Sequence, residues 1–103
     1  MKGTRASLRY AKALFETAKE RQVEKEVILN LEALEAIINE KTDFFNLINN
    51  PTISHRKKAS LFKTLFELKL NNTTMQFLFL VLKKGRESLL GDIIEKYKHL
   101  HLR

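Results

Sequence analysis

The sequence has no cysteine, no tryptophan, one proline and only three glycines among its 103 residues. The lack of cysteine excludes disulfide bonds and thiolate metal sites. Long apolar runs are missing too: the longest, Phe77 to Leu82, falls far short of the roughly 18 residues that a membrane-spanning helix needs. There is no sustained alternation of apolar residues and no Asn-Gly or Asp-Gly turn to support a β-hairpin. We therefore expect a helical protein without direct membrane insertion.

Basic residues outnumber acidic ones by 19 to 12, which gives a formal net charge of +7. Such an excess favours an acidic partner, such as nucleic acid, anionic lipid or an acidic protein surface. The basic residues are spread along the chain, however, with local clusters at Arg56-Lys57-Lys58, at Lys83-Lys84-Arg86 and near the C-terminus. A charge cluster on a helical protein is usually a solvated face, so net charge alone does not identify the partner.

Apolar residues recur with the helical period along the whole chain, which predicts an all-α fold. Short connections between the helices favour one compact bundle of about six helices, with residues 1–103 forming a single domain. The expected helices cover about Arg5–Glu20, Val23–Asn39, Thr42–Ile48, His55–Lys69, Thr73–Lys84 and Glu87–Leu102.

Local signals mark the helix ends. Thr42, Ser54 and Asn71 are N-cap candidates, Pro51 ends the short third helix, and Gly85 ends the fifth. The side chains expected to face the core are Leu8, Ala11, Leu14, Phe15, Ala18, Val27, Leu31, Leu34, Ile38, Ala59, Phe62, Leu65, Phe66, Leu90, Ile93, Ile94 and Tyr97.

Residues with reactive side chains form no recognisable catalytic or metal-binding pattern. His99 and His101 are two positions apart and point away from each other on a helix, whereas paired helical ligands need a spacing of four. Gly85 and Gly91 are isolated and follow no strand, so there is no phosphate-binding loop. We expect no enzyme activity, no cofactor, no metal and no small-molecule substrate.

Two of the expected helices carry more apolar surface than docking on one core requires. In the first helix, a second stripe of Ala6, Tyr10, Ala13 and Thr17 is rotated away from the core stripe. In the fifth helix, Phe77 and Val81 lie opposite the core stripe of Met75, Leu78, Phe79 and Leu82, with Leu80 and Lys84 beside them. Either these stripes are covered by tight internal packing, or they line a groove for a partner's amphipathic helix.

Three sequence segments resemble one family. The first segment, Arg9 to Phe15 (RYAKALF), is similar to the opening of the ATP synthase delta subunit, which is called the oligomycin-sensitivity-conferring protein in mitochondria. The segment from Asn50 to Ser54, followed by two lysines, resembles the family's mid-domain turn. Gly85-Arg86, followed by a Leu-Leu pair and then Tyr97, resembles the junction of its fifth and sixth helices. The order and spacing of these segments span almost the whole chain.

The resemblance implies a non-catalytic stator domain on the catalytic head of the ATP synthase. In this family the first and fifth helices of the N-terminal domain form a groove for the N-terminal helix of an alpha subunit. Carried over to this chain, the groove residues are Ala6, Tyr10, Ala13, Leu14, Thr17, Phe77, Leu80, Val81 and Lys84.

Full-length members of the family continue into a C-terminal domain that binds the b subunit of the peripheral stalk. This chain stops at Arg103, where that domain would begin, so we expect it to be the N-terminal domain of a longer subunit. Met1 and the lack of a transit peptide favour a bacterial source. The expected location is the cytoplasmic face of the bacterial inner membrane, as a peripheral part of the synthase.

The alternative is a basic, all-helical RNA-binding module that resembles the antitermination factor NusB. The net charge of +7 is compatible with this alternative. The basic residues do not form a single arginine-rich stripe with interleaved aromatic residues, which is the pattern typical of such modules. We therefore expect no nucleic acid partner.

Overall fold

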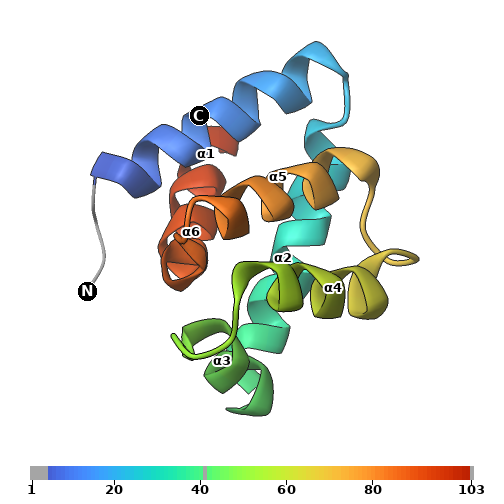
Figure 1. Cartoon of the computed structure of the whole chain (residues 1–103). Coiled ribbons are helices and arrows are strands. Elements are labelled where there is room, and N and C mark those ends of the chain that lie inside the picture. Colours follow the sequence, from blue (N-terminus) through green and yellow to red (C-terminus); the bar gives the residue numbers. More distant parts are fainter. Residues whose placement is uncertain (1–4, 41, 103) are drawn as a thin grey trace.

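The computed structural model describes residues 5–40 and 42–102, and for Thr42 and Phe45 it describes the backbone but not the side chain. Within these ranges the chain forms six α-helices and one 3₁₀ turn, with no strand (Figure 1). The elements are α1 (Arg5–Glu20), α2 (Glu24–Glu40), α3 (Thr42–Asn49), α4 (His55–Phe66), α5 (Asn72–Lys83), η1 (Glu87–Leu89) and α6 (Leu90–His101). The all-α prediction is confirmed. The expected last helix is divided, because its first turn is the separate 3₁₀ element η1.

Helix ends follow the local signals in the sequence. The Ser54 hydroxyl accepts a hydrogen bond of 3.1 Å from the backbone N–H of Lys57, and the Asn71 side chain accepts one of 2.9 Å from the backbone N–H of Thr74. Gly85 has a positive φ of 70°, the backbone conformation that terminates many helices. These caps confirm three of the expected helix boundaries. The predicted N-cap at Thr42 depends on a side chain that lies outside the described part of the structure.

Helix α5 occupies the centre of the bundle. It packs against α1, α2, α4 and η1, and Figure 1 shows it between α1 and α4. Consequently both of its faces are covered: Phe77 and Val81 are buried, as are Met75, Leu78 and Leu82 on the other stripe. Much of the apolar excess of α5 is therefore explained by its central position, which was one of the two interpretations of the sequence.

Two residues predicted to face the core do not lie there. Leu8 is 36% exposed and Leu65 is 47% exposed. On α1 the buried positions are Ser7, Ala11, Leu14 and Ala18, so the helix is rotated away from Leu8. Three of these four side chains are small, and α1 makes its most extensive contact with α6. Small residues let two helix backbones approach closely, which explains why Ser7 rather than Leu8 is buried.

A buried ion pair joins α3, α4 and η1. The ammonium group of Lys58 lies 2.5 Å from Glu87 Oε2 and donates a second hydrogen bond, of 2.8 Å, to the backbone carbonyl of Ile48. The side chains of Lys58 and Glu87 are 3% and 7% exposed. The interpretation of Arg56-Lys57-Lys58 as a solvated cluster is therefore wrong for Lys58, because this lysine neutralises a buried carboxylate.

The two structured glycines provide a matched pair for a stability test. A Cβ atom added to Gly91 would meet no atom within 4 Å, whereas at Gly85 it would lie 3.3 Å from the His55 ring on a backbone with positive φ. We expect Gly91→Ala to raise the free energy of unfolding by about 0.5–1 kcal/mol and Gly85→Ala to lower it by a similar amount or more. Urea denaturation of both variants measures the two signs. Equal effects would contradict the surface placement of Gly91.

Candidate partner-binding site between α1 and α5

Helices α1 and α5 lie side by side and run in opposite directions (Figure 1). In the middle of the pair, the rings of Tyr10 and Phe77 meet edge to face, with their centroids 6.3 Å apart. Just beyond the end of α1, the Arg21 guanidinium donates hydrogen bonds to Thr73 Oγ1 at 3.2 Å and to Gln76 Oε1 at 3.1 Å. These contacts pair the last turn of α1 with the first turn of α5, and they leave Ala6 at the same end as Lys84.

The predicted groove residues divide into an accessible set and a buried set. Leu14, Phe77 and Val81 are buried, and Val81 has no exposed surface. They can support the floor of the α1/α5 face, but Leu14 and Val81 present almost no surface to a partner in this conformation. Accessible surface is left on the half-buried residues Ala6, Tyr10 and Thr17 and on the exposed residues Ala13, Leu80 and Lys84.

The accessible surface is mostly apolar. Ala6 and Ala13 are small, Tyr10 is half-buried and Leu80 is 42% exposed. Small side chains let a partner helix come close, while tyrosine and leucine add contact area. Lys84 is the one charged residue of the predicted set, and it forms no ion pair with another residue of the described ranges. Its ammonium group is therefore available to a carboxylate on a partner.

A polar network holds the beginning of α5 against α2. The Asn30 side-chain oxygen accepts hydrogen bonds from the Asn71 backbone N–H at 2.9 Å and from the Thr74 hydroxyl at 3.1 Å. The Asn71 amide also donates to Glu26 Oε1 at 3.1 Å. These bonds fix the start of α5 relative to α2, and the Arg21 bridge links it to the end of α1. The sequence carries no signal for them, because each one joins residues that are distant in the chain.

The histidines near the C-terminus have separate environments. His101 stacks on the buried Tyr97 ring, with centroids 6.2 Å apart, and meets Phe15 edge to face. His99 instead lines a surface hollow together with residues of α1 and α6. Burial, reinforced by the nearby Glu24 carboxylate, raises the pKa of Tyr97 to about 12, so this phenol stays neutral in physiological conditions. Across residues 5–40 and 42–102, no three His, Asp or Glu side chains gather in a way that could hold a metal ion.

The structure thus combines an all-helical bundle with accessible apolar side chains on two adjacent helices. None of the described helices is both long and apolar enough to cross a membrane. A comparison with protein families matches residues 6–103 to the ATP synthase delta (OSCP) subunit, and the chain belongs to this family. The resemblance inferred from the three sequence segments is confirmed.

Individual relatives support the same assignment. The chain is 33% identical over 100 residues to the ATP synthase subunit delta of Chlorobium phaeobacteroides, covering 97% of this chain and 56% of that protein. It is also 33% identical over 91 residues to the subunit of Alkaliphilus oremlandii, covering 88% of this chain and 51% of the relative. The ATP synthase subunit delta of Cytophaga hutchinsonii is 32% identical over 98 residues, which cover 95% of this chain and 54% of that protein. The chain therefore spans about half the length of these relatives.

Proposed function

We propose that this chain is a non-catalytic stator domain of a bacterial ATP synthase, where it binds the N-terminal helix of an alpha subunit through the α1/α5 face. The observation that carries the proposal is the accessible apolar surface of Tyr10, Ala13 and Leu80 on two adjacent helices of a chain in this family. The partner helix would lie between α1 and α5, with apolar side chains at positions i, i+3, i+4 and i+7 on the face. A carboxylate of the partner near the end of α5 would pair with Lys84.

The adaptor role requires a second attachment. Since the relatives are about twice as long as this chain, we place the contact with the b subunit of the peripheral stalk in the part of the subunit that the chain does not span. Binding at both ends would hold the catalytic head against the rotation of the central rotor. The location that follows is peripheral, at the cytoplasmic face of the bacterial inner membrane.

A salt titration separates this proposal from the RNA-binding alternative, with which the net charge of +7 is compatible. We expect a synthetic peptide of the alpha-subunit N-terminus to bind with an affinity that changes by less than about threefold between 50 and 200 mM salt, because the contact is mostly apolar. A protein that neutralises several RNA phosphates would lose affinity by orders of magnitude over the same range. Tight, steeply salt-dependent binding of an RNA hairpin, with no binding of the peptide, would contradict the proposal.

A further inference from the structure

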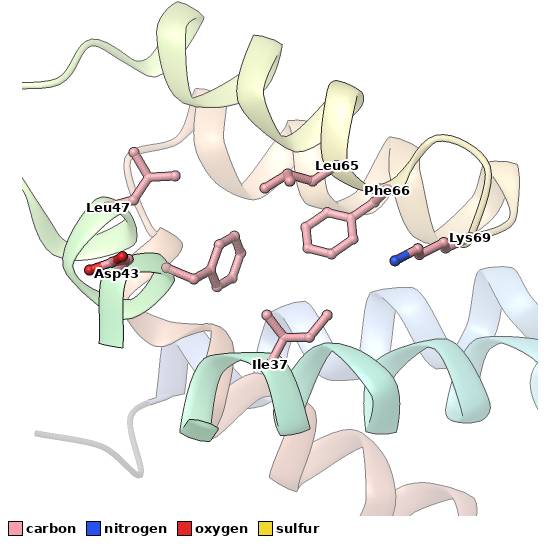
Figure 2. A pocket seen from close by; sticks show the side chains of 7 residues that line it. Ile37, Asp43, Leu47, Leu65, Phe66 and Lys69 are labelled. Carbon is pink, nitrogen blue, oxygen red and sulfur yellow. The ribbon is translucent and has the colours of Figure 1, made fainter. Parts of the chain in front are cut away.

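An apolar groove lies between α2, α3 and α4. Helices α3 and α4 are on the opposite side of α5 from α1 (Figure 1). The volume of the groove is about 560 Å³, within the range of about 300–1,000 Å³ that is common for ligand-binding pockets. Seven side chains line it: Ile37, Asp43, Phe44, Leu47, Leu65, Phe66 and Lys69 (Figure 2). None of them belongs to the α1/α5 face, so this α2/α3/α4 groove is a separate surface.

Aromatic packing makes the floor of the α2/α3/α4 groove rigid. The Phe44 ring lies 5.5 Å from the Phe62 ring and 5.6 Å from the Phe66 ring, and the last two rings are 5.9 Å apart. Phe44 and Phe66 are nearly covered, whereas Leu65 on the wall of the groove is 47% exposed. An exposed leucine above a fixed aromatic floor offers apolar contact area without a large rearrangement of the protein.

The two charged side chains of the groove have opposite signs and lie at its two ends. Figure 2 shows the Asp43 carboxylate beside Leu47 and the Lys69 ammonium group beyond Phe66, with the apolar side chains between them. Neither charge forms an ion pair within the described residues, and both side chains are exposed. The α2/α3/α4 groove is therefore apolar in its middle, with a negative charge at one end and a positive charge at the other.

We propose that the α2/α3/α4 groove docks a short amphipathic helix of a partner protein, with the start of that helix at Asp43 and its end at Lys69. A helix carries a partial positive charge at its N-terminus and a partial negative charge at its C-terminus, so this orientation places each end against the opposite charge. The reverse orientation places like charges together at both ends. A basic residue in the first turn of the partner helix and an acidic residue in its last turn would strengthen the preference for this orientation.

Occupancy of this groove does not depend on the α1/α5 face. The two surfaces share no residue, and α5 and the core lie between them. One copy of the chain could therefore hold two helices at the same time, one on each surface. This extends the proposed adaptor role, since a stator domain with two helix-binding surfaces makes more than one attachment within residues 5–102.

A pair of peptides with exchanged charges tests the proposal. Each is a covalently stapled helix with leucines at i, i+3, i+4 and i+7. One carries lysine in its first turn and glutamate in its last, and the other has these residues exchanged. We expect the first peptide to bind the 103-residue chain about four- to twenty-five-fold more tightly, since each end charge changes affinity by about two- to fivefold. Binding should shift the methyl signals of Ile37, Leu47 and Leu65.

Three variants provide the controls. The double variant Asp43→Lys, Lys69→Asp keeps the net charge and should reverse the preference between the two peptides. Leu65→Gln should weaken binding by about tenfold, whereas Leu80→Gln changes a leucine of similar exposure on the other surface and should leave it unchanged. The proposal is overturned if neither peptide binds, if both bind equally, if the double variant keeps the original preference, or if only signals of the α1/α5 face move.

Discussion

Replacing Lys58 by methionine is expected to lower the free energy of unfolding by about 3–5 kcal/mol, the largest effect of any single substitution proposed for this chain. Methionine fills most of the space of the lysine side chain, so the loss comes from electrostatics rather than from a cavity. Without the ammonium group, the buried Glu87 carboxylate would have no counter-charge, and its Oε1 atom already has no hydrogen-bond partner in the described structure. Urea denaturation followed by circular dichroism measures the change.

A double variant shows whether the cost comes from the unpaired charge. In Lys58→Met, Glu87→Leu both members of the pair are replaced by apolar side chains, and we expect most of the lost stability to return. The remaining cost includes the Ile48 carbonyl, which loses the hydrogen bond that Lys58 donates. A loss below about 1 kcal/mol in Lys58→Met alone would show that the pair is hydrated in solution and contributes as little as an exposed salt bridge.

The second large effect is expected for Ala13→Trp. Ala13 is exposed in the middle of the α1 stripe, so the indole should be tolerated by the fold while it occupies the space that a partner helix needs. We expect binding of the alpha N-terminal peptide to weaken by at least tenfold, with an unfolding midpoint close to that of the original chain. Fluorescence anisotropy with a labelled peptide measures the affinity.

Substitutions of two leucines show whether this loss is local to the α1/α5 face. Leu80→Gln removes apolar contact area from the α1/α5 face and should weaken binding of the alpha N-terminal peptide by about tenfold. Leu65 lies in the α2/α3/α4 groove, so Leu65→Gln should leave the affinity for this peptide unchanged. If Ala13→Trp binds the peptide as tightly as the original chain, Ala13 is ordinary surface and the second stripe of α1 has no role in binding.

The fold could be predicted from the sequence because helical periodicity and capping residues are local signals. They identified all six helices, and Ser54, Asn71 and Gly85 act at helix ends as expected. Periodicity predicts that a helix has an apolar face, but the exact rotation of that face depends on its neighbours. Leu8 and Leu65 were therefore assigned to the core, although close packing on α6 and the cluster of phenylalanine rings leave both at the surface.

The candidate site could be predicted only in part. The spacing of residues on α1 predicts its small and apolar stripe, and the family resemblance predicts a partner helix and a role for α5 in binding it, which stay predictions. Burial of Phe77 and Val81 depends on the central position of α5, which no local pattern specifies. The same holds for the bridge from Arg21 to Gln76 and for the pairing of Lys58 with Glu87, because these residues are 55 and 29 positions apart in the chain.

The most direct test of the central claim is to map the alpha N-terminal peptide on the chain by NMR. With ¹⁵N-labelled protein and unlabelled peptide, we expect the largest amide shifts at Tyr10, Ala13 and Val81. The backbone of Val81 adjoins Leu80 and reports on the floor of the α1/α5 face, even though its side chain is buried. Shifts confined to the Arg56-Lys57-Lys58 segment, with none on α1 or α5, would contradict the assignment of the α1/α5 face as the alpha-subunit site.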